Sequence, residues 1–355
     1  MKILYGIQGT GNGHISRARM LARHFSNSNI EVTYLLSGRS RDKFFDMDAF
    51  GDFSCLRGLT FYSENGRVNY PKTAIKNNIF RFAADMLALD VSAYDLIISD
   101  FEPISAWAGK LRGVKVIGLG HQYAFGHNIP RAGANLIASN VMRFFAPASF
   151  PLGLHWHHFG NPILPPIIDT DIKRVGSTAK DAAIATNKKS IVIYLPFENQ
   201  QSVQALVSPL KDFQFTIYSP ELKDEDHGHI ALRKTSLHGF KRDLESSQGV
   251  ICNSGFELIS ECLYLGLPVL SKPQGGQMEQ LSNAEALKTL AYATTTNQLD
   301  TLNIQQWLNN LSTPIILRFP DVAKRVVEWL STGQQETASE LSQTLWAQVE
   351  KTKEK

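Results

Sequence analysis

Gly9-Thr10-Gly11-Asn12-Gly13-His14 follows directly on the apolar run Ile3–Ile7 and leads into a segment of helical character, Ile15–Arg23. A strand, a glycine-rich turn and a helix in this order are typical of α/β folds that bind anions or nucleotides. The start of a helix offers unpaired N–H groups and a partial positive charge, and glycine lets a ligand approach the backbone. We therefore predict an anion or nucleotide site after the first strand, with Gly11 and Gly13 near the ligand.

The common glycine fingerprints do not fit this loop. Gly9, Gly11 and Gly13 alternate, whereas the dinucleotide pattern is G-x-G-x-x-G and a P-loop ends in Gly-Lys-Ser/Thr. The loop ends instead in His14, and a histidine imidazole exchanges a proton near neutral pH. His14 is thus a candidate acid or base. The alternative is a turn whose glycines only relieve backbone strain, with His14 as a polar cap.

Composition narrows the class of protein. Of the 355 residues, 43% are hydrophobic and 19% are charged, which indicates a packed globular protein of about two domains. The net charge of +3 argues against a dedicated nucleic-acid binder. The three cysteines suit a reducing compartment, and no apolar run approaches the ~20 residues that span a bilayer. We therefore expect a cytoplasmic protein.

Two series of apolar strands divide the chain. They are Ile3–Ile7, Ile30–Leu36, Tyr94–Asp100 and Val114–Leu119 in the first series, and Ser190–Pro196, Phe215–Ser219, Gly249–Asn253 and Leu267–Leu270 in the second. Apolar strands that alternate with helical segments indicate parallel sheets covered on both faces. The sequence therefore predicts an α/β protein with two Rossmann-like domains, 1–160 and 190–321, facing a central cleft. We expect a hinge or linker at 161–189, and helices at 322–355 that could pack back across the cleft.

A second strand-to-helix junction lies at Asn253-Ser254-Gly255-Phe256-Glu257. Backbone N–H groups and the Ser254 hydroxyl could bind a phosphate at the start of that helix. Glu261 shares a helical face with Glu257, and a carboxylate there could hold a ribose diol. The clustered amides of the loop 273–280 suit sugar hydroxyls. The alternative is a solvated acidic helix face beside an amide-rich surface loop.

These motifs, in this order, resemble those of the GT-B glycosyltransferases. The resemblance is carried by G-T-G-N-G-H (9–14), by Gly160-Asn161-Pro162, and by S-G-x-x-x-x-S-E (254–261), G-L-P (266–268) and E-Q-x-x-N-A (279–284). The chain resembles the N-acetylglucosaminyltransferases that make lipid II. It resembles more closely still a branch of predicted glycosyltransferases with S-D-F-E-P (99–103), L-P-F-E (195–198) and N-S/G-G-F (253–256). The resemblance implies a nucleotide-sugar donor held mainly by the C-terminal domain and an acceptor held by the N-terminal one.

The resemblance also implies donor contacts, named here by their numbers in this chain. Ser254 and Gly255 correspond to the residues at the diphosphate, and Glu261 to the residue at the ribose hydroxyls. Glu279, Gln280 and Asn283 correspond to the sugar side, and Phe240 and Lys241 to the pyrimidine pocket. Asn253 is a further residue on the donor side. A UDP-sugar, with UDP-GlcNAc favoured, is the implied donor. The segment Pro196–Ser202 has no glycine where the family has a glycine-rich loop, so the identity of the donor stays open. Lys241 is equally well interpreted as a solvated basic residue.

Glycosyl transfer needs a base for the acceptor hydroxyl and a site that stabilises the leaving diphosphate. His14 is the leading base, because a base works best near its own titration range. Asp100, at the end of a parallel strand in the same half, could orient the imidazole, and Glu102 is an alternative base. Asp100–Pro103 can also be interpreted as a helix N-cap with proline in the first turn. We expect an inverting reaction without a metal ion or other cofactor, since a helix N-terminus and cations can neutralise the diphosphate.

The acceptor is less determined, and a saccharide or a lipid-linked molecule would suit. His121 and Gln122 follow the next strand and are expected at the acceptor pocket. The aromatic segment Asn140–Phe150, with Arg131, could make a weak peripheral contact at the inner face of a membrane, although a buried helix is favoured. Two rival functions stay open: a nucleotide-sugar hydrolase or 2-epimerase on the same fold, and a nucleotide-sugar sensor without catalysis. The sequence does not indicate the oligomeric state.

Overall fold

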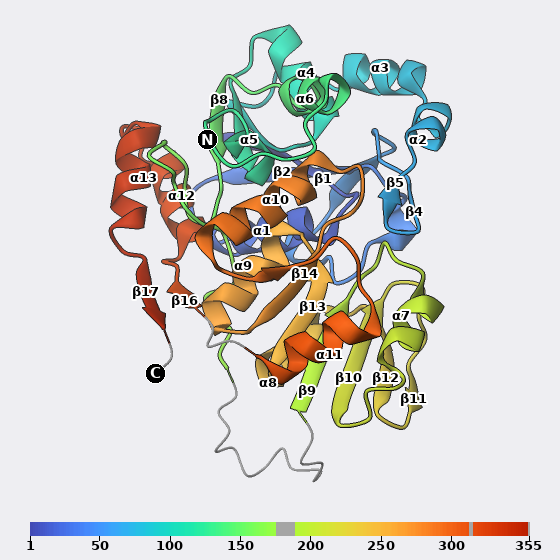
Figure 1. Ribbon diagram of the computed structural model, residues 1–355. Helices are drawn as coiled ribbons and strands as arrows, with labels where there is room; N and C mark the ends of the chain where they lie inside the picture. Colours follow the sequence, from blue (N-terminus) through green and yellow to red (C-terminus); the bar gives the residue numbers. More distant parts are fainter. Residues whose placement is uncertain (175–188, 312–314, 354–355) are drawn as a thin grey trace.

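The computed structural model describes residues 1–174, 189–311 and 315–353 (Figure 1). The linker predicted at 161–189 lies partly within this range, and its residues 175–188 fall outside it. The described chain forms two large sheets, the first parallel and the second parallel except at one edge, each flanked by helices (Figure 1). The predicted fold class is therefore confirmed.

The first sheet belongs to the N-terminal half and has six strands. In spatial order they are β3 (Phe53–Leu56), β2 (Glu31–Ser37), β1 (Lys2–Gln8), β6 (Leu96–Asp100), β7 (Val116–Gly120) and β8 (Phe150–Gly153). All neighbouring pairs run parallel. The central strands β1 and β6 are buried almost throughout, as expected of continuous apolar strands covered on both faces. Their carboxyl ends, at Gln8 and Asp100, lie at the same edge of the sheet.

Helices and short turns connect these strands. They are α1 (Asn12–Phe25), the 3-10 turns η1 (Arg41–Lys43) and η2 (Asp48–Phe50), α2 (Tyr70–Lys76), α3 (Ile79–Ala88), α4 (Pro103–Arg112), α5 (His121–Ala124) and α6 (Leu136–Phe144). Helix α1 begins at the end of the glycine-rich loop. Its N-cap residue is Gly11, so no side chain accepts a hydrogen bond from the first turn. Helix α4 begins at Glu102, with Pro103 in its first turn, which is a favoured start for a helix.

The second sheet has seven strands and belongs to the C-terminal half. In spatial order they are β11 (Glu225–His227), β12 (Ile230–Lys234), β10 (Phe213–Ser219), β9 (Lys189–Tyr194), β13 (Gly249–Asn253), β14 (Val269–Lys272) and β15 (Thr294–Thr295). The pairs are parallel except β11 with β12. The helices of this half are α7 (Gln200–Val207), α8 (Leu237–Ser246), α9 (Phe256–Leu265), α10 (Met278–Leu290) and α11 (Thr301–Asn309).

The last elements of the chain contact both halves: their first strand packs on α9 of the C-terminal half, and the two helices after it pack against the N-terminal half. These elements are β16 (Ile315–Arg318), α12 (Val322–Ser331), α13 (Ala338–Trp346) and β17 (Glu350–Lys353), and β16 pairs antiparallel with β17. The Trp329 ring stacks on Phe150 at 5.5 Å between centroids. Ser342 Oγ and Trp346 Nε1 both donate to the Ile163 carbonyl. These contacts tie the end of the chain to the first sheet, and Figure 1 shows α12 and α13 beside it.

A small hairpin of the N-terminal half reaches across to the C-terminal half. It consists of β4 (Ser63–Glu64) and β5 (Arg67–Val68), which pair antiparallel. Gly66 N donates to the Phe197 carbonyl at 2.7 Å, and Gly275 N donates to the Gly66 carbonyl at 2.7 Å. Val68 N donates in turn to the Gly275 carbonyl at 3.0 Å. The hairpin therefore joins the two halves through backbone hydrogen bonds.

Across the described ranges, none of the helices has the length and apolar character needed to cross a membrane.

Candidate active site

Two adjoining cavities lie between the halves. The first has a volume of about 260 Å³ and is lined by the glycine-rich loop, α6, the hairpin and the loop before α10. The second has a volume of about 670 Å³ and is lined mainly by α1, η2 and α8. The residues that line both cavities are Asn12, Gly13, Tyr194, Glu257 and Leu258, and we call them the shared wall.

His14 lies in the first cavity and is held by Asp100. Its Nδ1 lies 2.6 Å from Asp100 Oδ1. Burial alone would raise the pKa of Asp100, but the cation of Arg17 and the contact with His14 outweigh it, so this pKa is lowered and the group is a carboxylate. A carboxylate only accepts hydrogen bonds, so the proton of the neutral ring lies on Nδ1. Nε2 is then the nitrogen that can take a proton from a group in the cavity.

Arg17 connects this pair to the other half of the molecule. Its side chain is 1% exposed, and it donates from Nε to Asp100 Oδ2 at 2.8 Å and from Nη2 to Asp100 Oδ1 at 2.6 Å. Its Nη1 donates to Glu257 of α9. One buried cation thus binds a carboxylate from each half, which fixes Asp100 and the imidazole that it orients.

The strand-to-helix turn after Asp100 is strained. Phe101 has a φ of +52°, a left-handed conformation that non-glycine residues rarely adopt. Its ring is held by stacking on Phe145 at 5.0 Å and by an edge contact with Tyr123 at 6.0 Å. Such strain persists where the surrounding structure enforces it, and it is frequent at functional sites.

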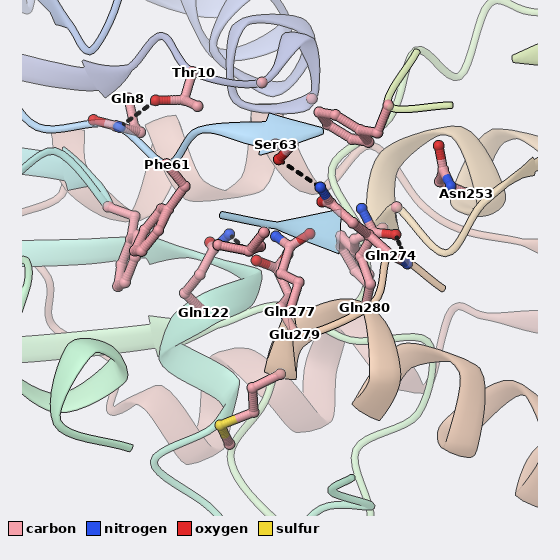
Figure 2. A pocket seen from close by; sticks show the side chains of 18 of the residues that line it. Gln8, Thr10, Phe61, Ser63, Gln122, Asn253, Gln274, Gln277, Glu279 and Gln280 are labelled. Carbon is pink, nitrogen blue, oxygen red and sulfur yellow. Dashed lines mark hydrogen bonds between the residues drawn. The ribbon is translucent and has the colours of Figure 1, made fainter. Parts of the chain in front are cut away.

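The opposite side of the first cavity carries amide groups. Figure 2 shows Gln274, Gln277 and Gln280 gathered there, with Phe61 on the other side. Three amide oxygens of this cavity, on Gln122, Asn253 and Gln277, are buried without a hydrogen-bond partner in the described structure. Gln122 Nε2 donates to Glu279 Oε2 at 3.0 Å and Asn253 Nδ2 to the Lys272 carbonyl at 3.1 Å, so these amides must turn their oxygens the other way. The cavity therefore offers acceptors to a ligand rich in hydroxyl groups.

Two helices begin at the shared wall. Gly255 is the N-cap of α9 and, like Gly11 before α1, provides no side-chain cap. The first turns of these helices meet, because a side chain on Gly13 would collide with the Glu257 carboxylate. The Glu257 carboxylate therefore lies beside the uncapped N–H groups at the start of α1, a position that favours an anion.

Comparison with known proteins identifies the family. The sequence profile of glycosyl transferase family 1 matches residues 1–312. The chain belongs to glycosyl transferase family 1. It is therefore an enzyme that transfers glycosyl groups. No curated protein matches the sequence.

Solved structures with the same fold are glycosyltransferases. The glycosyltransferase of kitacinnamycin is 13% identical over 98% of this chain and 99% of that chain, with a TM-score of 0.60. MurG from Acinetobacter baumannii is 12% identical over 98% of this chain and 99% of that chain, with a TM-score of 0.53. The spinosyn rhamnosyltransferase SpnG, in complex with thymidine diphosphate, is 15% identical over 98% of this chain and 96% of that chain, with a TM-score of 0.54. At these identities the likeness shows the GT-B fold.

Many of the predicted site residues of this glycosyltransferase lie together. The first cavity is lined by Gly11, Gly13, His14, Gln122, Asn253, Gly255, Glu279 and Gln280. The second cavity is lined by Gly13, Phe240, Lys241 and Glu261. The residues expected at the pyrimidine and the ribose thus lie on one side of the shared wall, and two of the three expected at the sugar, Glu279 and Gln280, lie on the other.

Glu102 does not suit the role of alternative base. Its side chain is fully buried and caps α4, accepting from Ile104 N at 2.9 Å, Ser105 N at 2.7 Å and Ser37 Oγ at 2.7 Å. Burial raises the pKa of this carboxyl, and the hydrogen bonds only partly offset the shift. The N-cap interpretation is therefore correct for Glu102, whereas Asp100 contacts His14.

Three other predicted contacts lie behind the cavity wall. The Ser254 hydroxyl is buried against Ser271 Oγ at 2.7 Å, and its N–H donates to the Lys272 carbonyl, so neither faces a diphosphate. The His121 ring is buried, lies 2.6 Å from Asn283 Oδ1 and stacks on Phe256 at 4.1 Å. Asn283 is fully buried and donates to the Ser254 carbonyl. These residues support the wall and do not line the described cavities.

Lys241 and Glu261 share a charged corner of the second cavity. Lys241 Nζ lies 2.5 Å from Asp169 Oδ2, so it is paired and not a free surface cation. Burial and, to a lesser degree, the nearby Asp169 carboxylate together raise the pKa of Glu261 to about 7, against the opposing effect of Lys241. A partly desolvated carboxyl group of this kind suits a ligand that brings its own hydroxyl donors.

The aromatic segment at 140–150 divides between helix and strand. Val141, Met142 and Phe145 line the first cavity, whereas Phe144 is 47% exposed. Phe150 begins β8. The interpretation as a buried helix is therefore correct only for part of the segment.

Arg17 and the hairpin belong to the site without having been predicted from the residue patterns. Arg17 lies three residues after His14 on α1, and this spacing places both on one helix face, which is a signal that could have found it. The hairpin has no comparable signal, because its partners at Phe197 and Gly275 are distant in the sequence.

Proposed function

We propose that this glycosyltransferase moves a sugar from a nucleotide-sugar to an acceptor hydroxyl, with inversion and with His14 as the base. The observation that carries the proposal is the imidazole held by Asp100, across one cavity from unpaired amide oxygens. The acceptor O–H would give its proton to His14 Nε2 while its oxygen bonds to the anomeric carbon. The bond from that carbon to the diphosphate oxygen would break, and its electron pair would leave with the nucleoside diphosphate.

The arrangement of the cavities supports a donor that spans the shared wall. The nucleoside would occupy the second cavity, with Phe240 beside the base and Glu261 on the ribose. The diphosphate would lie at the uncapped start of α9 near Gly255, where N–H groups and the helix dipole favour anions. The sugar would face Gln277 and Gln280 in the first cavity. UDP-sugars, UDP-GlcNAc among them, are the first donors to test, and dTDP-sugars belong in the panel because SpnG binds thymidine diphosphate.

The acceptor side of the first cavity is largely apolar. Its lining there includes Phe61, Phe101, Val141, Met142 and Phe145. A saccharide would leave its hydroxyl groups unpaired against such a wall, which costs free energy. Between the two acceptor classes considered, this favours a lipid-linked molecule.

A peripheral membrane contact is part of the proposal, on helices α2 and α3. Ile75 is 84% exposed, Phe80 is 89% exposed, and Ile79 and Leu87 are also exposed. Arg112 lies beside them, because it donates to the Leu87 carbonyl. Exposed apolar side chains flanked by cations suit the surface of an anionic bilayer.

The base is tested by replacing His14 with alanine. We expect kcat to fall about 10²–10⁴-fold, the usual contribution of a general base, with nucleotide affinity unchanged. Asp100→Asn should also lower kcat, because it removes the carboxylate that orients the ring. Turnover that survives intact in His14→Ala would exclude this base.

The rival functions are separated by a reaction without acceptor. Free sugar or an altered nucleotide-sugar would indicate a hydrolase or epimerase. Binding without turnover, with every acceptor offered, would indicate a sensor. A thermal-shift panel of UDP-, GDP-, dTDP- and CMP-sugars should first identify the donor, because a bound ligand raises the melting temperature.

A further inference from the structure

Arg17 lies against the imidazole of the proposed base. Its Nη2 is 3.2 Å from His14 Nδ1, and the same nitrogen donates to Asp100 Oδ1 at 2.6 Å. The ring proton lies on Nδ1, so these two nitrogen atoms share no hydrogen bond. The Arg17 side chain is 1% exposed, so little solvent screens its charge. A cation thus faces the ring that has to become positive during the reaction.

The position of this cation opposes proton transfer to His14. When the ring takes the proton of the acceptor it becomes an imidazolium, and two positive charges then lie side by side at a buried site. Like charges in contact repel strongly where water is excluded. Asp100 contacts both groups, but one carboxylate offsets only one of the two positive charges. The protonated base therefore needs a second negative charge nearby.

Glu257 of the C-terminal half supplies such a charge. It lies in the first turn of α9, and its carboxylate accepts a hydrogen bond from Arg17 Nη1. The carboxylate also lies against Gly13, beside the uncapped start of α1, where a negative charge is favoured. The Glu257 side chain is 18% exposed, and it lines both cavities. Arg17 is therefore held between one carboxylate from each half.

Two further titratable groups act on this cluster. Glu279 of α10 acts on Arg17 as an additional negative charge. Tyr5 of β1 acts on Asp100 and Arg17, but burial raises the pKa of its hydroxyl well above the usual value, so this group is neutral at physiological pH. In the described structure, Glu257 is the carboxylate of the C-terminal half that contacts Arg17 directly. Its removal should therefore change the charge balance around the ring.

We propose that Glu257 is a positioning residue that strengthens the base by neutralising Arg17, which leaves Asp100 to stabilise the imidazolium of His14. This inference rests on the proposed function, in which the acceptor O–H gives its proton to His14 Nε2 while its oxygen bonds to the anomeric carbon. The diphosphate leaves with the electron pair of the broken bond. Because Glu257 is on α9 and Arg17 on α1, the base has its full strength only where the two halves are in contact.

The first test is an NMR titration of the His14 ring in the full chain, with its signal identified by its absence in His14→Ala. In Glu257→Gln the ring should bind its proton ~10-fold more weakly than in the wild type, the usual effect of losing one nearby opposite charge. Glu257→Asp keeps the charge and should keep most of the wild-type proton affinity. Glu285→Gln is the matched control, because Glu285 is an exposed carboxylate on α10 of the same half, and it should titrate as the wild type does.

The second test measures turnover and nucleotide binding in the same variants. The acidic limb of the kcat/KM profile of Glu257→Gln should move to lower pH, and kcat on the plateau should fall several-fold, because a weaker base transfers the proton less readily. The affinity for UDP, measured by calorimetry, should not fall. Glu257→Asp should restore most of kcat, which a purely steric role of the longer side chain does not predict.

The outcomes separate this inference from the proposed function. If the ring titrates in Glu257→Gln as in the wild type while His14→Ala is inactive, the inference is wrong and the proposed function stands. If the ring titration shifts but turnover does not depend on His14, the effect of Glu257 on the ring stands and the proposed base is wrong. If Glu257→Asp and Glu257→Gln lose melting temperature and proton affinity equally, Glu257 acts by packing and the inference is wrong.

Discussion

At the scale of the residue, the environment of each carboxyl group decides its role. Three carboxyl groups have the same chemistry but different neighbours. Asp100 lies beside an arginine and a histidine, and Glu102 accepts from helix N–H groups and hydroxyls. Glu261 is buried beside a second carboxylate. Asp100 is thereby held as an anion that orients His14, Glu102 serves as a cap, and Glu261 titrates in the neutral range.

The raised pKa of Glu261 predicts a pH-dependent donor affinity. The ordinary pKa is 4.5 and the raised value is about 7, so the group is mostly protonated below pH 7 in the free protein. Ribose hydroxyls donate best to the ionised form, so we expect affinity to rise with pH through 7 and to fall by up to about tenfold for each unit below it. Calorimetry with the donor nucleotide between pH 5.5 and 8.5 measures this.

Glu261→Gln is the control for that titration, and its affinity should be lower and flat with pH. The same raised pKa favours folding at low pH, and this contribution is lost as the pH rises from about 4.5 to about 7. Above pH 7, Glu261→Gln should therefore melt no lower than the wild type. A pH dependence that persists in the variant would assign it to another group.

At the scale of the element, the β4–β5 hairpin of the N-terminal half is hydrogen-bonded to two loops of the C-terminal half, at Phe197 and at Gly275. Gly66 has a φ of +72° and lies against the Glu198 carboxylate, which is paired with Lys272. An alanine there would adopt a disfavoured conformation and also displace Glu198. We expect Gly66→Ala to weaken the backbone hydrogen bonds to Phe197 and Gly275 and to raise KM for the acceptor, because Ser63 and Val68 line the first cavity.

Hydrogen exchange at the amides of Val68 and Gly275 measures this directly, and both should exchange faster in Gly66→Ala. Gly228→Ala is the matched control: its φ is +63°, and no atom lies within 4 Å of the added methyl group. Both variants carry the strain of about 1–2 kcal/mol for a left-handed alanine, and only one disturbs the hairpin. Equal exchange in the two variants would contradict the role given to the hairpin.

At the scale of the whole molecule, the exposed apolar residues are unevenly placed. Ile75, Ile79, Phe80 and Leu87 lie within two successive helices at one end of the N-terminal half (Figure 1), whereas Leu302 is exposed on α11 of the other half. If α2 and α3 contact a bilayer, Phe80→Ser should lower the partition coefficient onto phosphatidylglycerol vesicles, measured by co-sedimentation, about 30-fold, since a buried phenylalanine contributes roughly 2 kcal/mol.

Leu302→Ser is the control, because it removes an exposed apolar side chain from the other half, and it should bind vesicles as the wild type does. Equal vesicle binding by both variants would show that the membrane contact does not lie on α2 and α3. A concentration-dependent increase in mass by light scattering, abolished by Phe80→Ser, would instead assign α2 and α3 to contact between two copies of the chain.

Short stretches of the sequence are enough to predict the two sheets, the glycine-rich turn and the histidine after it. Buried parallel strands are continuous apolar runs, and a glycine-rich turn between strand and helix is a short-range pattern, so both can be recognised within about ten residues. For the same reason Asp100 could be placed at the carboxyl edge of the first sheet. The family motifs added the residues of the donor side, most of which line one of the two cavities.

The roles within the site come from contacts between distant segments. Arg17 and Glu257 are 240 residues apart, and His121 and Asn283 are 162 apart. No local pattern distinguishes a carboxyl group that caps its own helix from one that meets a histidine, or a serine that faces a ligand from one turned into the core. The strands and the glycine-rich loop follow from short-range hydrophobic and steric preferences. The assignment of His14 and Arg17 depends on which charged side chains the packing of the two halves brings together.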